Sequence, residues 1–545
     1  MRTARIISVC ALVGVACNDP TPASESEAGE TAVDTTAPSS GTDSTTNVTP
    51  TTDVADTSSE SGTTGAPEPY PDPADWGPNA GPGGPAVEFD DADLLVNCAY
   101  LVGGDGDFDH HNLAVMFDGY LMLPWAPEFS SGGVSFFDVS DPCEPLRIGV
   151  GYATSMRETH ATGFAQIDDR WFAVTNYKEA GLIQQRGGIA FWDVTDVTAP
   201  EMVTELELPG FLYPDAYARV TLSVFWQVPY VYVAGADNGV YVVDARDPTA
   251  PELVEQYNFE PTLRAGGIQV IGNAMIVTAA EGPRTVIVDV GVPNVPQPLP
   301  GGDFDLMDSA LVAREAYFSN LAGGFMYYAV KNGGGGLLVY DIHDLSAPVY
   351  AGEFNSGGNG GYVFVKDDLA FVGESDFAGI YDVADPASIT QTAILDLEGD
   401  LDTVTPIGNI AVLSVDEESL PDQATALAPY ATAVDTTPPR VTWSVPEDGA
   451  TGLVATSRIG VTMSEMVDSK SAHAGSVRLF EKGVDPALGR VDGWISVQEN
   501  VINFAPQGVL TPGATYVFEI PAGGVVDYNG NPIEDAFSIE LTIAG

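Results

Sequence analysis

Basic residues are scarce in this chain. Only 20 of its 545 residues are Lys or Arg, against 77 Asp and Glu, so the formal net charge is −57. Binding to nucleic acid depends on cations that displace counterions from phosphate groups. Docking on anionic lipid likewise depends on clustered Lys and Arg. The composition therefore argues against nucleic acid as a partner and against electrostatic binding to a lipid surface.

Sequence motifs typical of catalytic sites are also absent. The sequence contains no Gly-x-Ser-x-Gly elbow, P-loop, dinucleotide fingerprint, His-Glu-x-x-His or Cys-x-x-Cys. An active site would have to be assembled from scattered loops. What the chain does contain is 59 Gly and 40 Pro, which is typical of turn-rich β structure.

Residues 1–17 have the pattern of an export signal. Arg2 and Arg5 precede an apolar run of 11 residues, 6–16, which ends at Cys17. This run is too short to span a bilayer, which needs about 20 residues. A cysteine at the cleavage point resembles the bacterial lipobox, in which the thiol is acylated, although Gly14 stands where lipoboxes favour Leu. The alternative is an ordinary cleaved signal peptide in which Cys17 has no role.

Acylation of Cys17 would make the chain an exported bacterial lipoprotein, held through its lipid at the outer membrane or cell surface, or else on the periplasmic face. Residues 18–85 are rich in Thr, Ser, Asp, Glu, Pro and Gly, and no Lys or Arg occurs between Arg5 and Arg147. Such a segment cannot bury enough apolar surface to offset chain entropy. We expect a disordered linker that tethers the folded body.

A repeat fills the middle of the chain. Two or three β-forming residues are followed by Asp, a small or branched residue and a turn, as in Ser-Phe-Phe-Asp-Val-Ser-Asp-Pro at 135–142. The repeated first Asp is found at Asp138, Asp193, Asp244, Asp289, Asp341 and Asp382, at intervals of 55, 51, 45, 52 and 41 residues. This is about the length of one four-stranded propeller blade. At a strand end, the Asp carboxylate is expected to accept backbone N–H groups of the following turn.

The series, often preceded by a Gly pair such as 132–133, resembles the LVIVD repeat over residues 93–430. That family forms β-propellers in exported bacterial proteins, with a largely undefined biochemical role. The copy at Asp289 departs most, because its turn has no second Asp. The resemblance implies a propeller over residues 86–434.

Seven hairpins but only six Asp motifs leave the last blade short of a strand. Residues 94–102 can supply it, so we expect the N-terminal strand to complete the seventh blade. Cys98 lies in that strand and Cys143 in the turn of the first blade. In an exported protein these two would form a disulfide that ties the closure. The alternative is a pair of buried free thiols.

Residues 435–545 form a separate module with short alternating strands. It contains Pro-Glu-Asp-Gly-Ala-Thr-Gly at 446–452, Ser-Glu-Met at 464–466, and Leu-Thr-Pro-Gly-Ala-Thr-Tyr at 510–516. These motifs resemble the bacterial Ig-like domains of the Big superfamily, although Met463 replaces the usual aromatic residue. The resemblance implies a β-sandwich that acts as a spacer or adhesive unit. The predicted fold is therefore all-β, a seven-bladed propeller followed by an Ig-like sandwich.

Three of the five histidines are candidates for chemistry. His110 and His111 precede the first hairpin and His160 precedes the second, where innermost strands begin at a mouth of the central channel. Roughly equivalent positions in later blades are Arg219, Arg264, Asp308, Asn359 and Asp402. Such a ring could hold a divalent metal or an anionic small ligand. The alternative is a polar mouth filled by water.

These features favour a surface lipoprotein whose propeller loops bind a protein or polysaccharide ligand. No catalytic residue is assigned. The rival hypothesis is a metal-dependent hydrolase with its site at the channel mouth, and a third is a structural component of a surface layer.

Overall fold

The structure is a computed structural model that describes residue 70 and residues 79–104, 113–126, 132–156, 159–178, 187–210, 223–331, 334–416 and 419–545. Residues 66–545 form one compact unit, to which the following description applies. Its helical segments within these ranges are two 3₁₀ turns, η2 (Pro386–Ser388) and η3 (Ser469–Ser471). No helix of the described ranges has the length and apolar character needed to cross a membrane.

Seven four-stranded antiparallel sheets make up the first part of this unit. Blade 1 contains β2 (Val115–Phe117), β3 (Tyr120–Trp125), β4 (Gly132–Asp138) and β5 (Leu146–Ala153). Blade 2 contains β6 (Gly163–Ile167), β7 (Arg170–Lys178), β8 (Gly187–Asp193) and β9 (Glu201–Leu208). Blade 3 contains β10 (Ser223–Gln227), β11 (Tyr230–Ala234), β12 (Val240–Asp244) and β13 (Glu252–Tyr257).

The remaining blades repeat this order. Blade 4 contains β14 (Ala265–Ile271), β15 (Ala274–Ala279), β16 (Arg284–Asp289) and β17 (Gln297–Asp305). Blade 5 contains β18 (Glu315–Ala322), β19 (Phe325–Lys331), β20 (Leu337–Asp341) and β21 (Val349–Phe354). Blade 6 contains β22 (Val363–Lys366), β23 (Leu369–Gly373), β24 (Ala378–Asp382) and β25 (Thr390–Leu395). Blade 7 contains β26 (Thr403–Ile407), β27 (Ile410–Ser414), β28 (Thr425–Pro429) and β1 (Ala99–Leu101).

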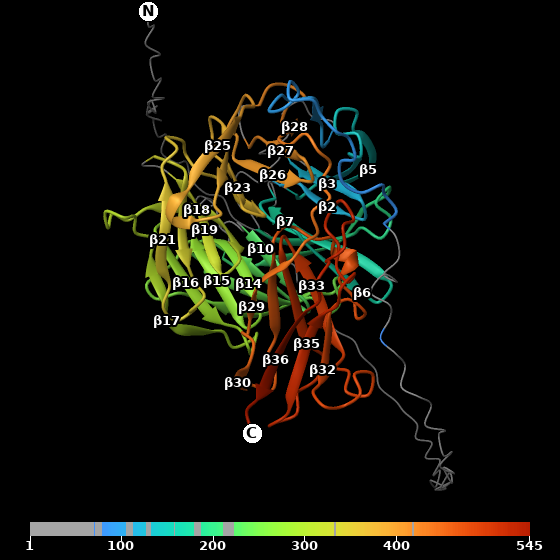
Figure 1. The fold of residues 1–545 in the computed structure, drawn as a ribbon, viewed down its shortest axis with the longest axis vertical. Helices are drawn as coiled ribbons and strands as arrows, with labels where there is room; N and C mark the ends of the chain where they lie inside the picture. The colour runs from blue at the N-terminus through green and yellow to red at the C-terminus, as the bar shows by residue number, and fades with distance from the viewer. Residues whose placement is uncertain are drawn as a thin grey trace, which may run out of the picture. The chain divides into compact units, whose positions relative to one another are not determined.

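The sheets close into a propeller, as the repeat predicts. The first strands of blades 2 to 7 contact one another in succession and are therefore innermost. Figure 1 shows the blades in chain order, from the blue strands of blade 1 through green and yellow to the orange strands of blade 7 beside them. The core lies between neighbouring blades, where large side chains such as Trp192, Trp226 and Phe371 are fully buried.

The ring is closed by the N-terminal strand. β1 pairs antiparallel with β28, with Tyr100 opposite Ala426. Cys98, directly before β1, forms a disulfide with Cys143 in the turn that follows β4. This bond ties the start of the closing strand to blade 1, whereas the closure itself is the non-covalent pairing of β1 with β28.

The repeated Asp residues anchor the turns after the third strands. Each carboxylate accepts the backbone N–H of the second residue after it, at 2.8–3.1 Å, in all six copies: Asp138, Asp193, Asp244, Asp289, Asp341 and Asp382. In five copies, all except the one at Asp289, a second Asp repeats this contact three residues later, for example from Thr249 N to Asp247 at 2.9 Å. This local role explains the repeat without a catalytic function.

The C-terminal part is a two-sheet sandwich. One sheet contains β29 (Val441–Val445), β31 (Ile459–Met463), β34 (Val501–Pro506) and β33 (Gly493–Gln498). The other contains β30 (Ala450–Leu453), β36 (Phe537–Ile543), β35 (Thr515–Ile520) and β32 (Arg478–Glu481). The first sheet continues into blade 2, because Val497 of β33 pairs with Phe164 of β6. The sandwich is therefore docked on the propeller, an arrangement that the expectation of a spacer did not include.

The end of the predicted linker also lies against both domains. Gly81 N donates to Asp118 O at 2.9 Å in blade 1, and Gly84 N donates to Tyr528 O at 2.8 Å in the sandwich. The Tyr70 hydroxyl donates to Leu479 O at 3.1 Å. Cys17 and most of the predicted linker, including residues 18–69, lie outside the described residues.

Candidate functional site

The two faces of the propeller carry different connections. Because strands alternate in direction, the turns after the first and third strands of each blade lie on one face, here called the turn face. The connections after the second and fourth strands lie on the opposite face, here called the loop face. The Ig-like sandwich covers the turn face: it contacts turns after the first strands of blades 1, 4, 5 and 6 through Asp118, Gly272, Gly323 and Asp367.

Directional side-chain contacts hold this interface. The side-chain amide of Gln498 bonds to the backbone of β10 as a neighbouring strand would. Its Oε1 accepts from Trp226 N at 2.9 Å and its Nε2 donates to Val224 O at 2.8 Å. Asn503 does the same with blade 4, accepting from Gly272 N and donating to Val270 O, both at 2.8 Å. Gly272 has φ 54°, and a Cβ there would lie 2.5 Å from Val445 O of the sandwich. Close approach of the two domains therefore requires a glycine at this turn.

The turn between β33 and β34 reaches the inner strands of the propeller. Glu499 Oε2 accepts hydrogen bonds from Gln269 Nε2 at 3.1 Å and from Asn320 Nδ2 at 2.8 Å. Asn500 Nδ2 donates to Leu321 O at 3.0 Å. Withdrawal from water raises the pKa of the Glu499 carboxyl to about 7, although its two amide donors act in the opposite direction. These contacts place the turn over the channel at the turn face.

A buried ionic cluster lies in the same interface. Asp435, Glu465 and Asp527 are the one group of metal-ligand type that comes together within the described residues. Lys366 occupies it, with Nζ 2.6 Å from Asp435 Oδ2 and in contact with Glu465. Burial raises the pKa of Glu465 to about 8 and that of Asp527 to about 6. An ammonium group thus takes the place that a metal ion would need, and the cluster joins blade 6 to the sandwich.

Aromatic rings occupy the channel on the loop-face side. His160 is buried, its Nδ1 is hydrogen-bonded to the Tyr362 hydroxyl, and it stacks on Phe318 with ring centroids 5.4 Å apart. Phe318 in turn stacks on Tyr362 at 4.0 Å. Phe318 lies in an irregularity of β18, where the register with β19 shifts between Ala316 and Ser319. Rings from blades 2, 5 and 6 therefore meet across the channel.

The predicted ring of polar residues does not assemble as one site in the described residues. Arg264 pairs with Glu281 at 3.2 Å, Asp308 accepts from Val312 N at 2.8 Å, and Asn359 Nδ2 donates to Ser375 at 3.2 Å. His110, His111 and Arg219 lie outside the described residues. The metal site of His110, His111 and His160 stays a prediction.

Asp402, one of the positions predicted to be equivalent to His160 in a later blade, interacts electrostatically with His160. Burial raises the pKa of its carboxyl to about 8, against the opposing effect of Lys331 and His160, and Asp400 and Asp416 raise it further. At neutral pH this group is therefore mostly a neutral acid. The described part of the mouth is therefore lined by buried aromatic rings and a buried carboxyl group whose pKa is raised to about 8.

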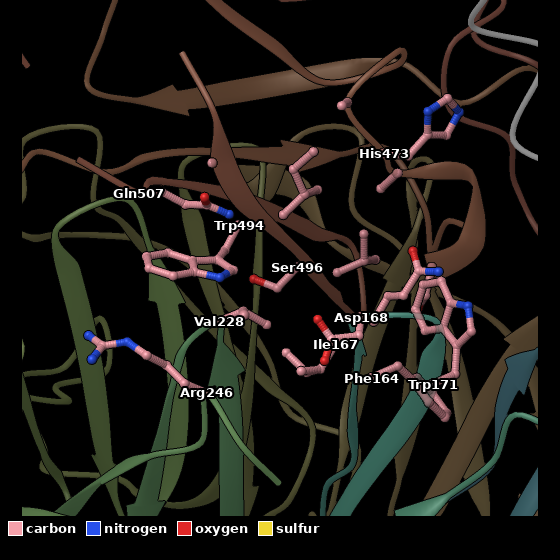
Figure 2. Close-up of a pocket in the computed structure, with 17 residues that line it drawn as sticks. Phe164, Ile167, Asp168, Trp171, Val228, Arg246, His473, Trp494, Ser496 and Gln507 are labelled. Carbon is pink, nitrogen blue, oxygen red and sulfur yellow. The ribbon is translucent and has the colours of Figure 1, made fainter. Parts of the chain in front are cut away.

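A groove of about 380 Å³ lies where blades 2 and 3 meet the sandwich. Its apolar floor includes Phe164, Val228 and Val497, all buried. Figure 2 shows Trp494 and Trp171 at opposite ends of the view, with Ser496, Ile167 and Asp168 between them.

Family models match both parts of the chain. Residues 435–542 match the model of the bacterial Ig-like domain, and residues 229–259 and 320–356 match the LVIVD repeat. The chain carries LVIVD repeats and a bacterial Ig-like domain. The two LVIVD matches fall in blade 3 and blade 5.

Comparison with curated proteins gives no match. Among solved structures, the periplasmic gluconolactonase of Pseudomonas aeruginosa is similar, with 12% identity, a TM-score of 0.45, and coverage of 65% of this chain and 98% of that one. The β-propeller domain of Cps50 from Myceliophteria thermophila is similar with 10% identity, a TM-score of 0.43, and coverage of 61% and 98%.

The groove between the LVIVD propeller and the Ig-like domain was not foreseen from the sequence. Trp171 is the second residue of the propeller strand β7 and Trp494 lies in β33 of the Ig-like domain, so no local pattern links them. The only available signal was an aromatic residue at a turn, since Trp171 follows Asp168, Asp169 and Arg170. Such a residue at a half-exposed position is common in β-sheets, so the signal is not specific.

Proposed function

We propose that this chain is an exported bacterial lipoprotein in which the LVIVD propeller and the Ig-like domain bind a ligand as one unit. The observation that carries the proposal is the docking of the Ig-like domain on the turn face through buried directional contacts. Gln498 and Asn503 together make four hydrogen bonds of 2.8–2.9 Å to the backbone of blades 3 and 4. A spacer that only separates a propeller from a surface does not need such an interface.

The groove is a better ligand site than the channel. Clefts between domains are common locations for binding sites, because two surfaces supply different side chains. The channel, by contrast, is occupied by stacked rings on one side and by the Glu499 turn on the other. The negative charge of the chain supports a protein or polysaccharide ligand rather than nucleic acid.

The number of residues that follow Cys17 supports anchoring at a distance from the membrane. Residues 18–69 provide 52 residues, which can span at most about 180 Å when extended. The bound ligand can then lie well above the membrane that holds the lipid. We place the anchor at the outer membrane or the cell surface.

Anchoring is tested by expressing the full chain in a Gram-negative host that is fed an alkyne-tagged palmitate. We expect label in a membrane-associated protein. Cys17→Ser should remove the label and release the protein from membranes, whereas Cys10→Ser, within the predicted signal, should leave both unchanged. An unlabelled wild-type chain would disprove lipidation.

Binding is tested by applying the purified full chain to an array that carries both oligosaccharides and peptides. We expect retention on members of one class. Ser496→Phe fills the middle of the groove and should lower the signal at least about tenfold, and Thr451→Phe, at an exposed position of β30, should not. Absence of any retention would refute the binding function, and equal retention by both variants would place the ligand elsewhere.

A further inference from the structure

We propose that the groove binds a neutral saccharide, with Trp171 and Trp494 as two aromatic platforms. The inference rests on the proposed binding function and specifies the ligand class. It is drawn from the side chains that line the groove and from the charge around them.

The two indoles come from different domains and are both held in position. Trp171 packs edge-on against Phe117, with ring centroids 5.4 Å apart. Trp494 is contacted by the Arg246 guanidinium, 5.7 Å from its ring centroid. Both tryptophans keep part of their surface exposed. Sugar rings present flat C–H faces, which pack well on large rigid aromatic surfaces.

Polar groups around the indoles suit sugar hydroxyls. Gln166, Asp168 and Gln507 line the groove and are exposed, and in the described part of the chain their side chains form no hydrogen bond with the protein. An amide both donates and accepts, and a carboxylate accepts. A hydroxyl also does both, so these three groups can pair with the rim of a sugar ring that lies on an indole.

The charge of the groove disfavours an acidic saccharide. Its cation, Arg246, is already paired with Asp244 at 3.2 Å and donates to the Tyr230 hydroxyl at 3.1 Å. Asp168 adds a negative charge, and the whole chain carries −57. An anion would therefore meet repulsion without a free cation to compensate.

The architecture also disfavours an extended peptide. Peptides often bind by adding a strand to a free sheet edge. Here the edge of β6 next to the groove pairs with β33 at one position, Val497 opposite Phe164, which leaves only a short stretch of edge for an added strand. The volume of about 380 Å³ falls in the usual range for small-ligand sites, and we infer that it holds one or two sugar rings of a longer chain.

The test is a titration of the full chain with maltotetraose, cellotetraose, laminaritetraose and chitotetraose, followed by calorimetry and by tryptophan fluorescence. We expect at least one of them to bind and to change the fluorescence. Trp171→Ala and Trp494→Ala should each weaken that binding at least about tenfold. Tyr100→Ala, an exposed aromatic position on β1 in blade 7, should leave it unchanged.

Removal of an indole that packs on Phe117 can also disturb the fold, so a second pair of variants is needed. Gln166→Ala and Gln507→Ala alter exposed side chains and should leave the melting temperature unchanged while weakening binding about threefold to tenfold. Gln297→Ala, at an exposed position of β17, is the matched control.

Two results separate this inference from the function on which it rests, and a third overturns both. Binding of peptides or acidic oligosaccharides on the array, without binding of the four neutral probes, would overturn the ligand class and leave the binding function intact. Saccharide binding that all four groove variants retain would overturn the site. If the chain binds none of these ligands, both proposals fail.

Discussion

Glu499, in the turn between β33 and β34, accepts a hydrogen bond from Asn320 Nδ2 of β18, 2.8 Å away. The two residues belong to different domains and lie 179 positions apart in the chain. Asn503 forms a similar link to blade 4. Because these contacts are directional and cross the domain interface, the Ig-like domain and the propeller are expected to unfold together, in one transition.

The strongest test of this coupling is Asn503→Ala. Its side chain accepts from Gly272 N at 2.8 Å and from Gln227 Nε2 at 3.0 Å, and it donates to Val270 O at 2.8 Å. Each buried partner left without a hydrogen bond costs about 1–3 kcal/mol, so we expect a loss of at least about 3 kcal/mol. Scanning calorimetry should show the single transition of the wild type splitting into two. Asn294→Ala, at an exposed position, should melt like the wild type, and an unsplit, unshifted Asn503→Ala would contradict the coupling.

Glu499 makes docking dependent on pH. Its pKa is raised from 4.5 to about 7 in the folded protein, so the folded state binds the proton more tightly than the unfolded state. The contribution of this group to stability is therefore fully present below about pH 4.5 and is lost as the pH rises through about 7. Glu499→Gln can accept the same hydrogen bonds without a charge. We expect its melting temperature to fall less between these pH values and to exceed that of the wild type at pH 8.

A control separates this effect from a general change in net charge. Glu534→Gln removes the same charge at an exposed position of the Ig-like domain. Its melting curve should follow the wild type across the same pH range. If both variants change the pH dependence equally, the buried position of Glu499 is not responsible.

The Cys98–Cys143 disulfide fastens the closing strand. It joins residues separated by 45 positions, and the chain-entropy model gives about 4 kcal/mol for a loop of this length. We expect the double variant Cys98→Ser/Cys143→Ser to unfold at lower urea concentration by that free energy. A reducing agent should shift the wild type by the same amount and leave the variant unaffected. Equal stability of the variant and the oxidised wild type would show that pairing of β1 with β28 is enough for closure.

The propeller could be predicted because its signals are local. Asp193 bonds Thr195 N and Asp341 bonds His343 N, each two residues away, so the same short motif recurs wherever the same turn is made. The closing strand could be predicted by counting strands. One blade lacked a strand, and the N-terminal residues before the first hairpin could supply it.

The docking of the Ig-like domain could not be predicted in this way. Gln498 pairs with Trp226, 272 positions away, and no periodic pattern marks a polar residue that will bond to a distant backbone. His160 was placed correctly at the start of an inner strand, but the ring that stacks on it, Phe318, comes from an irregularity of β18 that the repeat does not encode. The groove depends on that docking and was missed for the same reason.

A substitution of Asp402 tests whether the loop-face mouth holds a neutral carboxyl group. Burial raises the pKa of its carboxyl from 3.8 to about 8. The folded state therefore holds the proton, and the stability that this group contributes falls as the pH rises from about 4 through about 8. Asp402→Asn is close in shape and neutral at every pH. We expect its melting temperature to match the wild type near pH 4 and to exceed it at pH 7 and at pH 9.

The matched control is Asp396→Asn, at an exposed position before the same blade, which should show no gain at pH 9. Lys331 opposes the rise in the pKa of Asp402, so Lys331→Met should raise that pKa further. This variant should extend the pH-dependent loss of stability to higher pH, because the charged carboxylate would then lack its nearby cation. A large loss of stability in Asp402→Asn already at pH 7 would mean that the carboxylate is charged and bonded there, and the mouth would then carry an anion rather than a neutral acid.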